Sequence, residues 1–282
     1  VEVRGATSRA FDLQGSGTRA SELRHCVAQG GAVGLYVNQA TNIAVRHSVF
    51  AENASSAVYL GADAGLLLEN SILASTATNA VLYSLSATNG VAADYNGIHA
   101  GPFVRVGENR SSGAKADNLG AWQRLTRLDA HSVSGDPRLA DPGNYDYHLK
   151  TSETLGRLLP NGQRTSDSVS SPLLDAGNPA TAIGDEPEPN GGRVNIGKYG
   201  GTAEASIALS LPWLLADSFG DAGSVSNGET VALNWIFGGG LTTQTVAVSV
   251  STDGGKTWTN SVASGVPVTN GSVVWAVAGL PA

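Results

Sequence analysis

The chain has 282 residues, a formal net charge of −7 and 15% charged residues, and these values exclude several classes of protein. The acidic balance argues against a nucleic-acid partner, which would need a basic face to neutralise phosphates. Hydrophobic residues make up 41% of the chain, which is enough for a packed core. The apolar runs are too short for direct membrane insertion, and a single cysteine, Cys26, rules out an intrachain disulfide.

A repeat runs through the N-terminal third of the chain. Its copies begin at Val1, Leu23, Val45, Leu68 and Ala93, so the offsets are 22, 22, 23 and 25 residues. A second column, beginning at Gly34, Ala57 and Ala80, has a period of 23 residues. A unit of this length with alternating apolar residues predicts one coil of a β-solenoid, in which equivalent residues of successive coils stack about 4.8 Å apart.

The repeat assigns side chains to columns. We expect Leu23, Val45 and Leu68 to form an apolar stack in the core. The next column faces outward and contains Arg24, Arg46, Glu69 and Asp94, with His25 and His47 beside it. Small polar residues form a turn column of Cys26, Ser48, Ser71 and Asn96. We expect these turn residues to hydrogen-bond along the stack, because they satisfy backbone groups at the corners.

After Asp94 the period loosens and a series of motifs follows. They are Asp94-Tyr95-Asn96, Trp122, Asp129-Ala130-His131-Ser132, Asp136-Pro137, Ser171-Pro172-Leu173-Leu174-Asp175-Ala176-Gly177 and Arg193-Val194-Asn195-Ile196-Gly197-Lys198-Tyr199-Gly200. In this order they resemble the last coils of large bacterial right-handed β-helix proteins related in fold to pectate lyases, over about residues 20–206. The resemblance implies a right-handed parallel β-helix with a closing section over 94–206. It implies no single activity, because the family mixes polysaccharide lyases, adhesins and other surface proteins.

The C-terminal piece has alternating strands at sandwich-like spacing and resembles an immunoglobulin-like or fibronectin-III-like module. The fold class predicted for the whole chain is all-β, with a parallel β-helix over 1–208 and a partial β-sandwich over 209–282. We expect coils upstream of Val1 and further domains of the same longer chain. Within the sandwich, Ser251–Trp258 matches an Asp-box pattern and is interpreted as a structural hairpin.

Candidate catalytic residues lie in the outward column and its neighbour. β-Helix lyases need a base of lowered pKa beside carboxylates that hold Ca²⁺ against an acidic sugar. Glu69 and Asp94 are the candidate cation ligands, His47 the candidate base and Arg46 the neighbouring cation. The alternative is structural: Arg46 and Glu69 then form a surface ion pair of small energy, and the histidines are turn residues.

Two further groups of residues are candidates for binding a metal. Asp185, Glu186 and Glu188 offer the carboxylate oxygens that Ca²⁺ prefers, although alternation with proline also favours an extended solvated loop. Asp129, His131 and Asp136 are interpreted as structural, because no helix fixes their spacing. Asp175 and Arg193 are expected to cap the closing section by a salt bridge or by bonds to turn backbone. No other cofactor is predicted.

Three functions follow as hypotheses. The first is a non-enzymatic extracellular or cell-surface module, structural or adhesive, whose partner is a polysaccharide or a neighbouring surface protein. The second is a polysaccharide lyase or related carbohydrate-active enzyme, and the third is a subunit of an extracellular filament or sheath. A groove with a Lys or Arg within reach of two carboxylates would favour the enzyme, whereas a smooth face of Thr, Ser and Asn would favour the first hypothesis.

Overall fold

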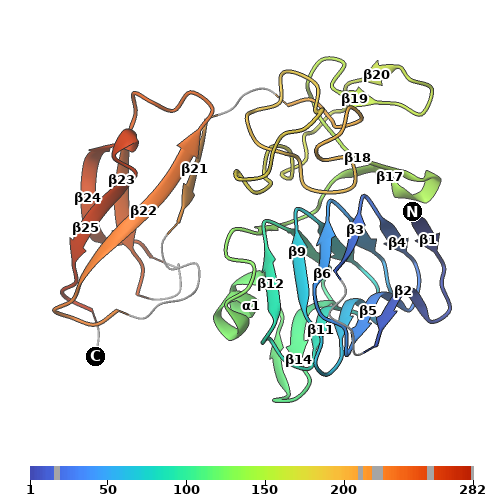
Figure 1. Ribbon diagram of the computed structural model, residues 1–282. Coiled ribbons are helices and arrows are strands. Elements are labelled where there is room, and N and C mark those ends of the chain that lie inside the picture. The colour runs from blue at the N-terminus through green and yellow to red at the C-terminus, as the bar shows by residue number, and fades with distance from the viewer. Residues whose placement is uncertain (16–19, 209–211, 218–224, 253–256, 281–282) are drawn as a thin grey trace. The chain divides into compact units, whose positions relative to one another are not determined.

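The computed structural model describes residues 1–15, 20–208, 212–217, 225–252 and 257–280 (Figure 1). The chain divides into two compact units, Val1–Leu209 and Ser210–Ala282. The first unit is a parallel β-solenoid and the second is built from antiparallel strands. The predicted all-β fold class, a parallel β-helix followed by a partial sandwich, is therefore confirmed.

Three parallel sheets run along the solenoid, and each of the first four coils gives one strand to every sheet. The first sheet contains β1 (Glu2–Arg4), β4 (Val27–Gln29), β7 (Val49–Ala51), β10 (Ile72–Ser75), β13 (Gly97–Ala100) and β16 (Val133–Ser134). The second contains β2 (Arg9–Gln14), β5 (Val33–Asn38), β8 (Ser56–Leu60), β11 (Val81–Leu85), β14 (Arg105–Asn109) and, antiparallel to β14, β15 (Ala114–Ala116). The third contains β3 (Ser21–Arg24), β6 (Ile43–Arg46), β9 (Leu66–Glu69) and β12 (Val91–Asp94).

The strand register confirms the repeat in the third sheet. Leu23 pairs with Val45, Val45 with Leu68 and Leu68 with Ala93, so the predicted apolar stack exists. Together with the inward residues of the other two sheets, these side chains form one continuous core. Stacking in register places like side chains on one another, and for this reason the repeat is visible in the sequence.

Two copies of the repeat pair differently from the sequence alignment. Glu2 pairs with Val27 in the first sheet, so the copy at Val1 is three residues out of its predicted alignment. In the second sheet Tyr83 pairs with Val58, two residues from the partner that the alignment gave it. The strands of all three sheets carry similar short apolar patterns, and such patterns do not by themselves fix which strands pair.

The predicted turn column is a hydrogen-bonded ladder. The backbone N–H of Cys26 donates to Ser48 Oγ at 3.1 Å, and the N–H of Ser48 donates to Ser71 Oγ at 3.1 Å. The N–H of Ser71 donates to Asn96 Oδ1 at 3.0 Å, and that of Asn96 to Ser132 Oγ at 2.8 Å. One side chain per coil therefore satisfies one buried amide of the preceding coil.

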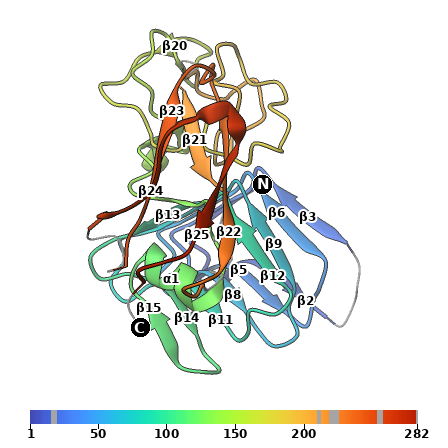
Figure 2. The ribbon, with the colours of Figure 1, turned by 90° about the vertical axis from the view of Figure 1, so that its left-hand side faces the viewer.

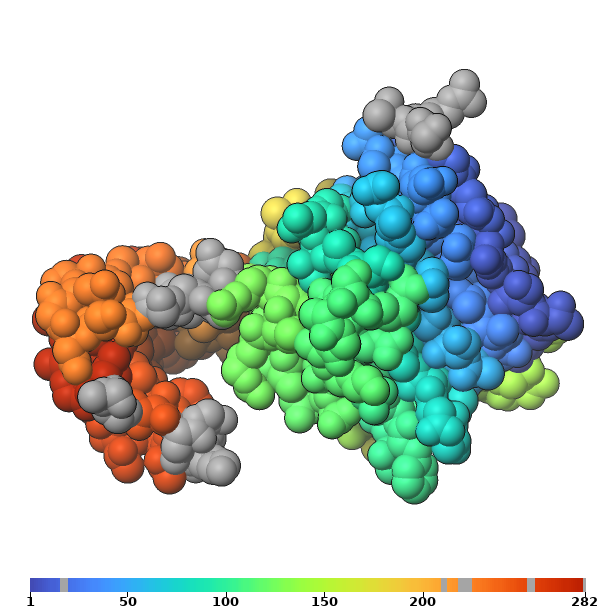
Figure 3. Space-filling model, turned by 90° about the horizontal axis from the view of Figure 1, so that it is seen from below, coloured from blue at the N-terminus to red at the C-terminus, as the bar shows by residue number. Residues whose placement is uncertain are grey.

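The coils continue past Asp94 and end under a short helix that the sequence motifs did not predict. Strands β13 and β14 extend the first and second sheets, and α1 (Leu119–Thr126) then covers the end of the stack. The Asn118 side chain accepts from Ala121 N–H and caps the helix N-terminus. Trp122 is fully buried and stacks on Tyr83 with 5.1 Å between ring centroids. In the space-filling view the green side chains of this segment lie at the end of the stack opposite the blue first coil (Figure 3).

Residues 135–208, here named the covering segment, lie against the outer face of the first sheet rather than forming further coils (Figures 1 and 2). Its short elements are β17 (Leu139–Asp141), η1 (Pro142–Asn144), β18 (Asp146–Leu149), β19 (Arg157–Leu158) and β20 (Arg164–Thr165). The outward side chains of Val27, Val49 and Ile72 are apolar, and they pack with Tyr147 and Leu173 in a second core. The predicted closing section over 94–206 thus contains two parts, the last coil with its helix and this lateral cover.

The described residues of the second unit form the strands β21 (Trp213–Ala216), β22 (Thr230–Gly238), β23 (Thr245–Val250), β24 (Asn260–Pro267) and β25 (Ser272–Ala276), with η2 (Val268–Asn270). They form two antiparallel sheets, β21-β22-β25 and β23-β24. Trp235 is buried and donates from Nε1 to the carbonyl of Val268 at 2.7 Å. Residues 253–256 of the Asp-box hairpin predicted at 251–258 fall outside the described residues, and so do 209–211 at the start of the predicted sandwich. Among described helices, none has the length and apolar character needed to cross a membrane.

Candidate functional site

The outward column of the third sheet lies in the predicted register, and its charges pair with one another. Arg46 contacts Glu22 at 3.1 Å and Glu69 at 3.5 Å, while Arg24 contacts Glu22 at 3.0 Å. Glu69 also accepts a hydrogen bond from the Asn178 side chain of the covering segment. These contacts occupy the two candidate residues Arg46 and Glu69, and surface pairs of this kind contribute about 0–1 kcal/mol each.

The candidate base His47 is buried beneath the covering segment. Its ring stacks on His25 with 5.4 Å between centroids, and only 1% of the residue is exposed. A side chain on Gly200 would begin 2.7 Å from His47 Nδ1, so the covering segment lies directly on the ring. Burial, followed by the charges of His25, Arg24 and Arg46, lowers the pKa of His47 to about 4. His47 therefore does not share an open face with Glu69 and Asp94.

Asp94 forms a carboxylate–imidazole pair with His131. Its Oδ2 lies 2.6 Å from His131 Nδ1 and its Oδ1 accepts the His131 backbone N–H at 2.7 Å. The imidazole stacks on Tyr95 with 4.8 Å between ring centroids. Asp129 is fully buried instead and accepts from Ser132 Oγ at 2.6 Å and Trp122 Nε1 at 3.2 Å. Asp129 and His131 thus have different partners, Asp129 in the buried cluster and His131 with Asp94.

The acidic run of the covering segment is divided between interior and surface. Glu186 is buried and accepts the backbone N–H groups of Asn195 and Gly201 at 2.8 Å each, whereas Asp185 and Glu188 are exposed. Burial raises the pKa of Glu186 to about 7. Within the described ranges, no group of three His, Cys, Asp or Glu side chains is arranged to hold a metal ion.

The two residues expected to cap the covering segment act mainly through backbone. The Arg193 guanidinium is buried and donates to the carbonyls of Ala176 and Gly177. Asp175 Oδ1 is buried without a hydrogen-bond partner among the described residues, and the backbone N–H of Asp175 donates to Asn195 Oδ1 at 2.8 Å. Burial, followed by the neighbouring Glu186 carboxylate, raises the pKa of Asp175 to about 7. These contacts hold the last loop of the covering segment in place.

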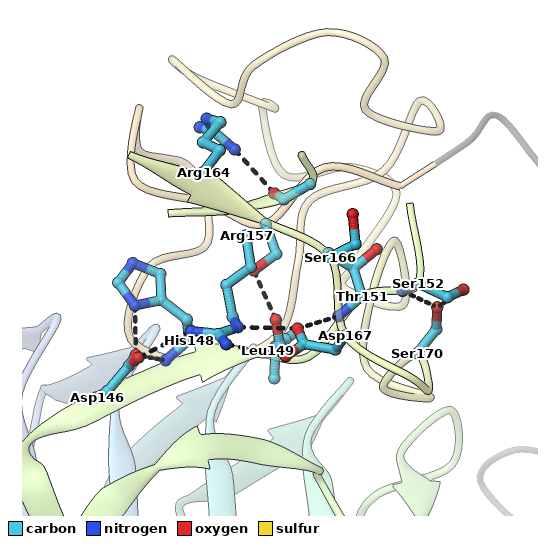
Figure 4. Close-up of polar contacts among 12 residues, drawn as sticks. Asp146, His148, Leu149, Thr151, Ser152, Arg157, Arg164, Ser166, Asp167 and Ser170 are labelled. Carbon is cyan, nitrogen blue, oxygen red and sulfur yellow. Dashed lines mark hydrogen bonds and ion pairs between the residues drawn. The ribbon is translucent and has the colours of Figure 1, made fainter. Parts of the chain in front are cut away.

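A second ionic network braces the middle of the covering segment (Figure 4). The Arg157 guanidinium binds both oxygens of Asp167, at 2.8 and 2.9 Å, and Asp146 Oδ2 at 3.0 Å. Asp146 Oδ1 lies 2.5 Å from His148 Nδ1, and the His148 ring stacks on Tyr199 at 3.8 Å between centroids. The hydrogen bonds that Arg157 donates to Asp167 raise the pKa of Arg157. Bidentate pairing holds β18 and the loop after it in one geometry.

The covering segment leaves one part of the first sheet open, and this part is a cleft of about 430 Å³. Its floor is the row Gln29, Ala51, Ala74 and His99, which are paired in register on β4, β7, β10 and β13. Glu52 and Thr76, from the turns after β7 and β10, form one rim. The opposite wall belongs to the covering segment and includes Asp136, Pro137, Arg138, Leu139, Pro142, Lys150 and Val169. The volume lies within the range of small-ligand sites.

Charges of both signs line the cleft, and most of them are held in place. Glu52 Oε2 accepts from the backbone N–H and the hydroxyl of Thr76 at 3.0 Å each. Asp136 Oδ1 accepts the backbone N–H of Arg138 at 2.8 Å, and the Arg138 guanidinium donates to the carbonyl of Ser170. Lys150 follows β18 directly, and its charge acts on the Asp167 carboxylate without an ion pair between the two groups. Its ammonium group lines the cleft as a donor available to a ligand.

The sequence contained a partial signal for this cleft. Its floor residues occupy one position of the repeat, immediately after the inward residues Ala28, Phe50, Leu73 and Ile98. Alternation along a strand places that position on the outer face. The wall could not be found in this way, because Asp136 and Lys150 reach the floor only through the path of the covering segment.

Comparison of the chain with models of protein families, with curated proteins and with solved structures finds no match in any of the three. The class that the structure defines is thus a fold class, a parallel β-solenoid with a lateral cover and an antiparallel C-terminal unit. Function has to be argued from the cleft itself.

Proposed function

We propose that this chain is a carbohydrate-binding module of an extracellular or cell-surface protein, with a structural or adhesive role. The cleft on the first sheet carries the proposal. A pyranose ring has an apolar C–H face and a rim of hydroxyl groups. The cleft is complementary, because its floor is partly apolar and its edges are polar. Ala51 and Ala74 give a flat apolar floor, while Glu52, Asp136 and Lys150 stand at its edges.

The polar groups of the cleft suit hydroxyl recognition for a physical reason. Carboxylates that are already oriented by Thr76 and Arg138 accept hydroxyl hydrogens without further ordering. The ammonium group of Lys150 donates to ring or hydroxyl oxygens. A charge-assisted hydrogen bond of this type contributes about 1.5–3 kcal/mol, so the loss of one weakens binding by roughly 10- to 100-fold.

The proposal includes an extracellular location, which the amino-acid composition supports. The chain has one cysteine and four lysines, with 36 glycines that suit a turn-rich solenoid. The proposal also makes the second unit an immunoglobulin-like or fibronectin-III-like spacer. Its antiparallel sheets and the buried Trp235 support this part of the proposal.

The experiment is calorimetric titration of the full chain with di- and hexasaccharides of galacturonic acid and of glucose. We expect binding of at least one series, weakened roughly 10-fold or more by Lys150→Ala and by Glu52→Gln. Lys115→Ala is the matched control, because Lys115 is exposed on β15 and away from the cleft residues. Binding that is equally sensitive to the control, or no binding of either series, would refute the proposal.

A second candidate is a polysaccharide lyase, favoured by one observation. Lys150 and Arg138 line the same cleft as Glu52 and Asp136, and cations beside carboxylates are the combination that such chemistry needs. Incubation with polygalacturonate and Ca²⁺ tests this candidate. Ultraviolet absorbance from unsaturated products, lost in Lys150→Ala, would replace the binding module by an enzyme.

A further inference from the structure

A second hollow, of about 460 Å³, lies at the turn between β13 and β14. It is lined by Asn79 and Ala80, by residues 100–105 of the turn, and by Asp117. Phe103 is 72% exposed there, the most exposed phenylalanine of the described chain. Arg105 and Asp117 pair beside it, with 3.1 Å from Nε to Oδ1. The hollow therefore combines an exposed aromatic ring with a donor and an acceptor at its edge.

The hollow lies near the cleft along two neighbouring turns. On one turn His99 lines the cleft and Phe103 the hollow, and on the other Thr76 lines the cleft and Asn79 the hollow. Backbone bonds lock the two turns together, from Gly101 N–H to the Ser75 carbonyl at 2.9 Å and from Asn79 N–H to the Phe103 carbonyl at 3.1 Å. The four steps from His99 to Phe103 span at most about 14 Å of chain.

We infer that the cleft and the hollow form one track for an extended saccharide chain, in which Phe103 is a stacking platform beyond the cleft. The inference rests on the proposed function and deepens it, because it makes the ligand an oligosaccharide rather than a single sugar. The face of a phenyl ring is electron-rich and attracts the weakly positive C–H groups of a pyranose. Arg105 and Asp117, which form a surface ion pair beside Phe103, can present a donor and an acceptor to the hydroxyl rim of the same pyranose.

Gly101 supports this arrangement at the boundary between the two spaces. A side chain there would begin 3.0 Å from Thr76 Cα and 3.3 Å from the Ser75 carbonyl oxygen. Its absence lets the turn that borders the hollow pack closely on the turn that borders the cleft.

The test uses the full chain and the same hexa- and disaccharides of galacturonic acid and of glucose, measured by calorimetry. In the series that binds, we expect the hexasaccharide to bind at least 10-fold more tightly than the disaccharide. Phe103→Ala should remove that gain and leave disaccharide binding unchanged, and Phe103→Trp should retain it. Leu155→Ala is the matched control, since Leu155 is another exposed apolar residue of the first unit, 58% exposed.

The outcomes separate the two proposals. Disaccharide binding that depends on Lys150, combined with no effect of Phe103→Ala on the hexasaccharide, overturns the track and leaves the cleft. A concentration-dependent increase in mass that Phe103→Ala abolishes would show that the ring meets a second copy of the chain, which also overturns the track. Absence of binding in both series overturns the cleft and the track together.

Discussion

The packing of the covering segment on the first sheet can be tested at one contact, Gly97 against Leu173. Gly97 lies in β13, and Leu173 is fully buried in the second core. A Cβ added to Gly97 would lie 2.5 Å from Leu173 Cδ1 and 3.1 Å from Cδ2, both below ordinary van der Waals contact. Gly97→Ala should therefore overpack this interface and lower the free energy of unfolding by about 1–3 kcal/mol.

Leu173→Ala removes the side chain that the new methyl group meets. Alone it should lower the free energy of unfolding by about 2–5 kcal/mol, through lost burial and the cavity that remains. In that background Gly97→Ala should cost close to nothing, because the methyl group now enters the vacated space. The double-mutant cycle should give a favourable coupling of about 1–3 kcal/mol.

The assay is urea-induced unfolding followed by circular dichroism, on the full chain and its variants. Gly120→Ala is the control: it lies in α1, its added Cβ has no neighbour closer than 3.5 Å, and it should add about 1 kcal/mol of stability in either background. If Gly97→Ala costs as much with Leu173→Ala as without it, the cover does not pack on β13 and the reasoning fails.

Three further predictions concern the ladder and the buried charges. Arg157→Met should lower the free energy of unfolding by about 3–5 kcal/mol, because the carboxylates of Asp167 and Asp146 lose their buried cation. A loss below about 1 kcal/mol in urea unfolding would contradict this prediction. Ser71→Ala leaves the Ser48 amide without its acceptor and should cost about 1–3 kcal/mol, with faster hydrogen exchange at that amide; unchanged exchange would disprove the ladder's role. The pKa of His47 is about 4 in the folded protein and about 6.5 when unfolded, so protonation favours the unfolded state between these values. As the pH falls through this window, wild type should lose about 3 kcal/mol relative to His47→Asn, and parallel pH profiles would contradict the burial of His47.

The coils show most clearly how much of the fold can be predicted from the sequence. The apolar stack of Leu23, Val45 and Leu68 and the turn ladder of Ser48 and Ser71 were both predicted and are both present. Each follows from a local rule, since a parallel stack places equivalent residues on one another and a buried amide requires an acceptor. The sequence by itself therefore determined the repeat, the coil length and the direction in which most side chains of the coils point.

The position of the covering segment is visible only in the tertiary structure. Val27, Val49 and Ile72 read as ordinary strand residues, and nothing local says that a chain more than sixty residues away lies over them. The same holds for the candidate site. His47, which the repeat placed beside the outward column, is buried under Gly200, and Lys150 lines the cleft only because of where the covering segment lies. Periodicity fixes relations between neighbouring coils, whereas the position of an aperiodic segment depends on which exposed apolar face it can bury, and only the folded chain shows that face.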